Sequence, residues 1–221
     1  MSILTKLAGA WKTSKLFFVK VAGVWKPGRM LYTKVAGQWR LVYARPRYAV
    51  WAQGLVQTVE PAAFRGFWVN FNAPLPGSFG RSYNLIQFNS RGMVTYQKTF
   101  DLHADGIPET QLANANAFTE DLNKMLVGQL FVIYTFDEPE RGRLLGNLPA
   151  AMYRIGVSQS LYENFHYRGA YCILGQVGRA PFFENYIGAD NPGGIDDGDP
   201  NAATGLRFIL EDGVPIILDT H

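Results

Sequence analysis

Residues 130–136 read LFVIYTF, and this nearly continuous apolar run predicts a buried central strand. A strand of this composition is covered on both faces, so we expect it inside a sheet. Upstream, residues 111–126 change to a helical period, with apolar residues three to four positions apart and charged residues outside them. Those apolar residues are Leu112, Ala115, Phe118, Leu122 and Met125. The two patterns together predict a helix packed on a sheet.

The segments on either side predict the remaining elements of the same domain. Alternating patterns indicate strands at 64–71, 83–89, 90–101 (after a turn at Arg91-Gly92) and 171–177. A second helix is expected from Pro149, a good first-turn residue, to Gly156. Residues 182–188 are expected to form a helical turn, and 206–218 a closing hairpin over Glu211-Asp212-Gly213. The predicted fold class is α+β, with a mixed β-sheet domain and packed helices over residues 61–221.

One segment occurs three times near the N-terminus, as LTKLAGAWK (4–12), FVKVAGVWK (18–26) and YTKVAGQWR (32–40). Trp11, Trp25 and Trp39 therefore follow a strict spacing of fourteen. β-Branched and aromatic residues around a central Gly are the composition of a hairpin. Gly9, Gly23 and Gly37 supply the positive φ of a short loop, such as Val21-Ala22-Gly23. Residues 1–45 thus read as an all-β hairpin-repeat module, followed by a linker over 46–60 that contains Pro46 and Gly54.

The three Trp residues have two interpretations. Exposed rings would serve as platforms for sugars or nucleic-acid bases. We favour a core role, because a lone hairpin is marginal in water and three in series can bury three Trp side chains against one another. Repeats of the form V-K-V-x-G-x-W-K resemble segments found near the ends of many phage tail and fibre proteins. That resemblance covers residues 4–40 and implies an assembly module.

The net charge of +3 conceals an asymmetry. Residues 1–59 contain ten Lys or Arg and no Asp or Glu, whereas the remainder carries 11 minus 18, or −7. A basic arm is typical of contact with nucleic acid, an anionic surface or an acidic protein partner. We favour the acidic protein partner over nucleic acid, because the Lys and Trp residues lie in a rigid repeat. Since these charges would repel between copies, we expect the arm to dock on a different protein, each chain being one copy of a homo-oligomeric ring or spike with several copies per virion.

Composition limits the class of protein. At 221 residues and 48% apolar content, the chain is long enough to bury a substantial core. A single Cys, Cys172, excludes an internal disulfide. No apolar run approaches the roughly 18 residues of a membrane span, and residues 1–30 lack a signal-peptide layout. We therefore expect a soluble protein made in a reducing compartment.

Residues 80–188 carry a family resemblance. The stretches GRSYNLIQFNSRGMVTYQKTFD, LFVIYTFDEPERG and YRGAYCILGQVGRAPFFENYIG resemble the interleukin-like EMT inducer (ILEI, PANDER-like) domain. That family has, in the same order, R-G-x-N with F-D-T-Y, a strand ending D-D/E-G, and F-R-D-x-W followed by S-P-F-E. This chain departs from it at Ser82 (family Gly), Leu102 (Thr), Gly169 (Asp) and Tyr171 (Trp), and lacks the family's disulfide cysteines. The domain is therefore expected to be held by its core alone.

The resemblance implies a carbohydrate site, since its relatives include secreted signalling proteins and the non-catalytic, glycan-binding stem domain of an O-mannose N-acetylglucosaminyltransferase. The matching positions are Asp137, after the central strand, and Arg168, before the strand at 171–177. A carboxylate and a guanidinium at loop ends can hydrogen-bond sugar hydroxyls, and Tyr167 or Tyr171 could stack on a pyranose face. The alternative is that Asp137 and Arg168 form an internal salt bridge that fixes two loops.

Enzymatic and metal chemistry have weak support in the sequence. Cys172 lies in an apolar strand six residues from His166, and a buried structural thiol is the commoner case. His103 and His166 have no metal-binding spacing, and GRLLGNLP (142–149) lacks the Lys and Ser/Thr of a phosphate loop. The acidic loop DNPGGIDDGDPN (190–201) has oxygens suited to calcium but lacks a distal Glu. We expect no catalytic residues, no cofactor and no metal.

These observations favour a structural phage tail protein, located in the virion and synthesised in the host cytoplasm. Its repeats would dock on other tail proteins through an acidic surface, and its ILEI-like head would face outward, with host surface carbohydrate as the ligand. The alternative is a free-standing carbohydrate-binding or signalling module without enzymatic activity.

Overall fold

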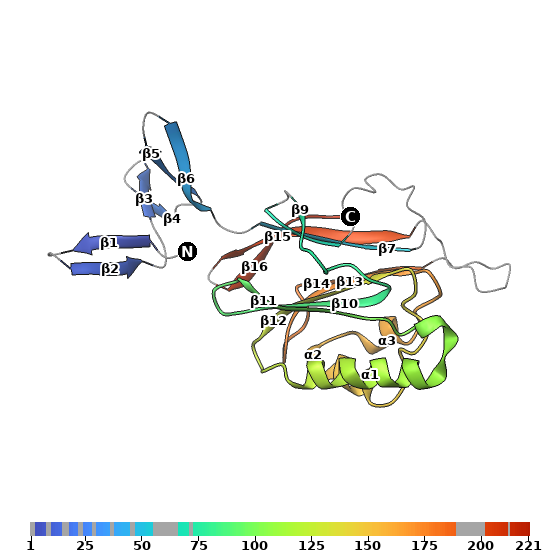
Figure 1. Cartoon of the computed structure of the whole chain (residues 1–221). Helices are drawn as coiled ribbons and strands as arrows, with labels where there is room; N and C mark the ends of the chain where they lie inside the picture. Colours follow the sequence, from blue (N-terminus) through green and yellow to red (C-terminus); the bar gives the residue numbers. More distant parts are fainter. Residues whose placement is uncertain are drawn as a thin grey trace. The chain divides into compact units, whose positions relative to one another are not determined.

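The chain divides into two compact units, Met1–Arg45 and Pro46–His221, in the computed structural model (Figure 1). The structure describes residues 3–7, 10–14, 18–21, 24–27, 30–35, 38–44, 47–54, 66–70, 73–188, 202–211 and 213–221, with the backbone alone described up to residue 44. None of the described helices combines the length and apolar composition needed to cross a bilayer.

The described backbone of the N-terminal unit consists of short antiparallel strand pairs. They are β1 (Ile3–Leu7) with β2 (Ala10–Ser14), β3 (Phe18–Val21) with β4 (Val24–Pro27), and β5 (Met30–Val35) with β6 (Gln38–Ala44). The registers repeat as the sequence does: Lys6 lies opposite Trp11, Lys20 opposite Trp25 and Lys34 opposite Trp39. Val21 pairs with Val24, so it belongs to the strand rather than to the expected loop. The loop glycines Gly9, Gly23 and Gly37 and the packing of the Trp side chains lie outside the described structure.

The described strands of the second unit form one ten-stranded sheet that folds into two halves. The first half runs β11 (Val94–Phe100), β10 (Ser82–Phe88), β12 (Leu130–Phe136), β13 (Ala170–Gln176) and β14 (Phe183–Ile187). The second runs β9 (Ala73–Pro74), β8 (Gly66–Val69), β7 (Arg47–Gln53), β15 (Ala203–Glu211) and β16 (Val214–Thr220). A parallel pairing of Phe136 with Gln53 joins the halves.

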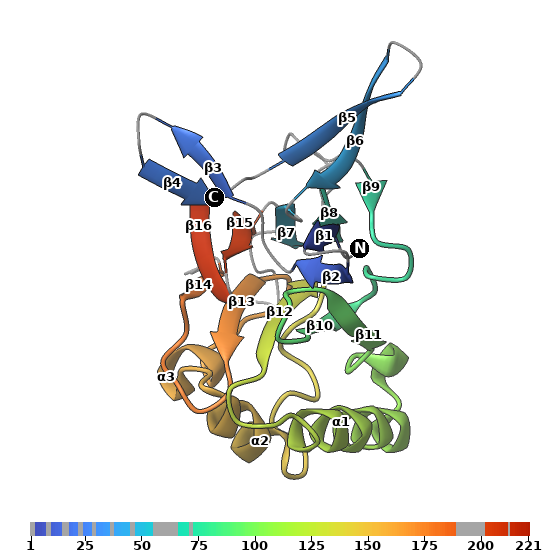
Figure 2. The ribbon, with the colours of Figure 1, turned by 90° about the vertical axis from the view of Figure 1, so that its left-hand side faces the viewer.

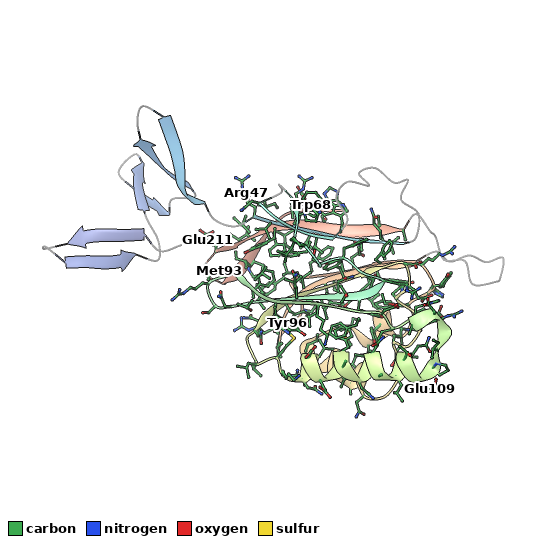
Figure 3. The ribbon with its side chains drawn as sticks, in the orientation of Figure 1. Arg47, Trp68, Met93, Tyr96, Glu109 and Glu211 are labelled. Carbon is green, nitrogen blue, oxygen red and sulfur yellow. The ribbon has the colours of Figure 1, made fainter. Side chains whose placement is uncertain are left out.

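Helices cover one face of the first half. They are α1 (Pro108–Asn123), α2 (Leu148–Ile155) and α3 (Gln159–Tyr162), and Figure 2 shows them on the same side of the sheet. The helix-side core includes Phe118 and Leu122 of α1 with Phe131 and Ile133 of β12. Figure 3 shows side chains filling the space between these layers, with Tyr96 lying between β11 and α1. The result is a layer of helices on a layer of strands.

The second half of the sheet covers the opposite face of the first. Phe88 of β10 contacts three rings of the second half, with centroids 5.2 Å from Tyr48, 5.9 Å from Phe67 and 6.1 Å from Phe208. Residues of β12 alternate between the two cores, so Val132 faces this second core while Ile133 faces the helices. The predicted doubly covered central strand and the α+β class are confirmed.

Most sequence-predicted elements of this unit are confirmed, and three expectations are wrong. The linker expected over 46–60 is wrong for Arg47–Gln53, which form β7, an interior strand whose residues from Tyr48 onward are buried; residues 55–60 lie outside the described structure. The helical turn expected at 182–188 is strand β14, paired with β13. Leu112, expected on the inner face of α1, is 43% exposed; it lies near the start of the helix, before Ala115, the first buried residue of α1.

Candidate functional site

The ends of three strands meet at one edge of the first half-sheet. Because β12 is antiparallel to β10 and β13, its last residue lies beside the starts of both neighbours. Ser82 pairs with Phe136, and Tyr171 N–H donates to the Thr135 hydroxyl at 2.8 Å. Asp137 and Arg168 therefore occupy the same edge. We call Ser82, Asp137, Glu138, Tyr167 and Arg168 the polar edge.

Left-handed backbone conformations gather at the polar edge. Ser82, Asp137 and Arg168 have φ of +68°, +64° and +60°. Residues with a side chain rarely adopt this conformation, which costs about 1–2 kcal/mol each and persists only where the surroundings enforce it. Non-glycine strain of this kind concentrates at functional sites, so the polar edge is the candidate site of the described structure.

Ser82 is fixed by its neighbour in the chain. The Asn84 side chain accepts a hydrogen bond from Gly80 N–H at 2.8 Å and donates one to Gly80 C=O at 2.9 Å. This closes residues 80–84 into a tight bend with Ser82 inside it, and the Ser82 hydroxyl accepts from His103 N–H at 3.3 Å. The left-handed Ser82 stands where the resembled family has Gly, the residue that adopts such a conformation without strain.

Asp137 turns the chain directly after β12. Its N–H donates to Gln53 C=O at 3.0 Å, which ties the polar edge to the end of β7. The side chain is half-buried, and within the described residues its buried Oδ1 has no hydrogen-bond partner. An enclosed carboxylate oxygen is costly to leave unpaired, so Asp137 has acceptor capacity that a donor group could use.

Glu138 is a member of the polar edge that the sequence analysis did not identify. Its side chain is fully buried, and Oε1 accepts hydrogen bonds from Glu140 N–H at 2.9 Å and Arg141 N–H at 3.0 Å. The second oxygen, Oε2, is buried without a partner in the described part of the chain. Burial raises the pKa of Glu138 to about 7, against the opposing effect of the two N–H donors. The sequence feature that could have indicated Glu138 is that a second acid follows Asp137 directly after the nearly continuous apolar strand at 130–136.

Tyr167 and Arg168 form the tip of a turn. Gly169 N–H donates to His166 C=O at 3.2 Å, and Tyr167 and Arg168 are the two residues between them. The Arg168 guanidinium lies over the Tyr167 ring, 4.7 Å from its centroid. This is a cation–π geometry, so the tip presents a preassembled pair of donor cation and aromatic ring.

Tyr171 has a different role from the one the sequence analysis allowed. Its side chain is fully buried in the helix-side core, and its ring centroid lies 4.6 Å from that of Phe165. The hydroxyl donates to Glu184 Oε1 at 2.7 Å, and burial raises the pKa of Tyr171 well above its ordinary value. A ring enclosed in this way cannot stack on a sugar. Stacking on Tyr171 was therefore a wrong expectation, since alternation along β13 turns this residue inward.

A braced loop flanks the polar edge on the β11 side. Arg81 donates to both carboxylate oxygens of Asp101, at 3.0 and 2.6 Å, and to Asp105 at 2.8 Å. Burial favours a higher pKa for Asp101, but the Arg81 hydrogen bonds and the N–H groups of Ala104 and His103 outweigh it and lower that pKa. These satisfied pairs hold the loop in place and leave it little capacity for a ligand.

Reactive and metal chemistry find little support in the described structure. Cys172 is buried in the core between the two half-sheets, and burial raises the pKa of its thiol, so it is a structural cysteine as expected. Within the described ranges, no group of three or more His, Cys, Asp or Glu side chains could hold a metal ion. The acidic loop at 190–201 lies outside the described residues.

No protein-family model matches this chain, and no curated protein matches it.

Proposed function

We propose that this protein is a structural component of a phage tail, at the tip, baseplate or fibre, that attaches through its N-terminal repeats and displays the second unit as a head. The repeats support attachment, because three copies at a spacing of fourteen place a Lys opposite each Trp in the same register. The ten basic residues and no acids before Glu60 support an acidic partner surface on another tail protein.

We further propose that the head binds carbohydrate on the host surface at its polar edge. The observation that carries this proposal is the convergence of Ser82, Asp137 and Arg168 in left-handed conformations at one sheet edge. Asp137 offers a carboxylate acceptor and Arg168 a fork of donors held over an aromatic ring. That combination suits the hydroxyl pairs and apolar faces of a pyranose.

A second candidate function uses the same domain without a virion. A free-standing carbohydrate-binding or signalling module would also use the polar edge. The residues of the polar edge would contact the carbohydrate in the same way as in the tail protein. The basic repeats favour the tail protein, since a free module has no need of an arm that carries ten positive charges and three copies of one hairpin.

The experiment is Arg168→Ala in the full chain, assayed for binding to host cells and for melting temperature. A recognition role predicts loss of binding with little change in melting temperature. Arg179→Ala is the matched control, because Arg179 is an exposed arginine in the turn between β13 and β14. If Arg168 instead serves an internal salt bridge with Asp137, the variant loses about 1–3 kcal/mol of stability, and binding falls only as the protein unfolds. That result would overturn the recognition role.

A further inference from the structure

Tyr186 lies on β14, where the sequence pattern predicted a helical turn. β14 pairs with β13 in a register that sets Tyr186 opposite Tyr171. Tyr186 packs against the helix-side core, whereas the preceding Asn185 donates to the Thr204 hydroxyl of the second half-sheet at 2.9 Å. The alternation of the strand therefore directs Tyr186 toward the segment that leads from α3 into the polar edge.

Two contacts join Tyr186 to that segment. The Tyr186 hydroxyl accepts a hydrogen bond from His166 N–H at 2.6 Å. Its ring stacks on Phe165, with centroids 4.6 Å apart and planes at 26°. Phe165 is itself 1% exposed and contacts Tyr162 of α3 at 5.4 Å between centroids. Tyr186 thus contacts both His166, the first residue of the turn, and Phe165, the residue before it.

Two glycines, Gly169 and Gly188, lie close to the same ring. A Cβ at Gly169 would lie 2.6 Å from Tyr186 Cε2 and from its hydroxyl oxygen, and a Cβ at Gly188 would lie 2.1 Å from that oxygen. Neither distance is possible for a real side chain, so Tyr186 occupies space that both glycines leave open. Gly169 is the last residue of the turn, and it stands where the resembled family has Asp. Tyr186 therefore contacts the turn at both of its ends, His166 and Gly169.

We propose that Tyr186 is a positioning residue that holds Tyr167 and Arg168 in the conformation in which the polar edge binds its ligand. Arg168 has φ of +60°, and a residue in this region needs neighbours that prevent it from relaxing. The hydrogen bond to His166 N–H and the packing on Gly169 supply that restraint at the two ends of the turn. The consequence for binding rests on the proposed carbohydrate recognition, whereas the restraint of the turn does not.

The restraint is tested by limited trypsin digestion of the full-length Tyr186→Phe variant. This substitution keeps the ring and removes the acceptor of His166 N–H. Trypsin cuts after Arg168 only when the turn opens, so we expect cleavage there to become about fivefold faster. Cleavage after Arg91, an exposed residue in the turn at the far end of β10, is the reference within the same molecule. Tyr96→Phe is the matched control, since it removes a hydrogen bond of the same 2.6 Å length, to Asp121.

Unchanged cleavage after Arg168 in Tyr186→Phe would overturn the proposal. Host-cell binding of the same variants then tests the link to recognition. Faster cleavage with at least a fivefold loss of binding supports it, provided that Tyr96→Phe binds as the unmodified protein does. Faster cleavage with unchanged binding would reduce Tyr186 to a structural brace and overturn its role in recognition. If the unmodified protein binds no host cell, the proposed recognition fails while the cleavage result still decides the restraint.

Discussion

Glu138 makes the stability of the head depend on pH in a direction opposite to that of Asp101 and Asp121, whose pKa values are lowered in the fold. It is fully buried, only Oε1 has hydrogen-bond donors among the described residues, and burial raises its pKa from 4.5 to about 7. A carboxyl that binds its proton more tightly when folded stabilises the fold fully below the unfolded pKa. That contribution is lost as pH rises through the folded pKa. For Glu138 the window of loss runs from about pH 4.5 to 7.

The perturbation is Glu138→Gln, which keeps the shape and an acceptor oxygen for Glu140 N–H and Arg141 N–H but cannot ionise. The gap between 4.5 and about 7 corresponds to an upper bound of about 3 kcal/mol. We therefore expect the variant to equal the unmodified protein near pH 4.5. At pH 8 we expect it to be more stable by about 1–3 kcal/mol, which raises the melting temperature by several degrees.

The assay is a series of melting temperatures between pH 4.5 and 8 for both proteins, compared at each pH. Taking the difference removes the contributions of other carboxylates, such as Asp101 and Asp121, whose lowered pKa values stabilise the fold above acidic pH. Glu109→Gln is the control, because Glu109 is exposed at the start of α1 and should leave the profile unchanged (Figure 3). A Glu138→Gln protein no more stable than the unmodified one at pH 8 would refute the argument.

Three further outcomes follow from the repeats and the core. Trp25→Ala should abolish incorporation into particles while a 46–221 fragment stays folded, since in the core role expected for Trp25 its loss costs about 3–5 kcal/mol; normal incorporation would assign the repeats another purpose. The isolated chain should be monomeric or weakly associated by light scattering at moderate salt, and a tight oligomer without a partner would contradict docking on another protein. Gly92→Ala should destabilise the head by about 1–3 kcal/mol more than Gly128→Ala in urea unfolding. Both glycines have positive φ, but a Cβ at Gly92 would lie 2.9 Å from Leu210, whereas nothing lies within 4 Å at Gly128; equal losses would contradict the packing.

The sequence predicted the elements whose residues carry an unambiguous period. The apolar run at 130–136 has the length and composition of a doubly covered strand. α2 runs from Leu148 to Ile155, because Pro149 favours its first turn and the left-handed Gly156 caps its end. β7 was missed because Pro46 and Gly54 are residue types typical of linkers, and they led to the prediction of a linker. In the sequence they flank the strand Arg47–Gln53, which is buried on both faces. β14 was missed because FENYI has no clean apolar alternation, and only its aromatic and β-branched content indicated a strand.

Part of the polar edge could be predicted in the same way. The strand order places the end of β12 beside the start of β13, so the meeting of Asp137 and Arg168 at one edge followed from topology. The burial of Tyr171 and Glu138 did not, because it depends on which face of β13 meets the helices and on how residues after β12 turn inward. The positive φ values at Ser82 and Arg168 could not be predicted from residue type either, since Ser and Arg seldom adopt positive φ.

The copy number of this protein on purified particles decides whether it is a tail component. Virus particles would be purified by density gradient from the lysate in which the protein is made, and quantified by mass spectrometry against the other tail proteins. We predict a fixed ratio that survives repeated purification, and label at the tail in electron micrographs of particles treated with an antibody to the head. Recovery of the protein only in the soluble fraction, with unlabelled particles, would contradict the proposal and favour the free-standing module.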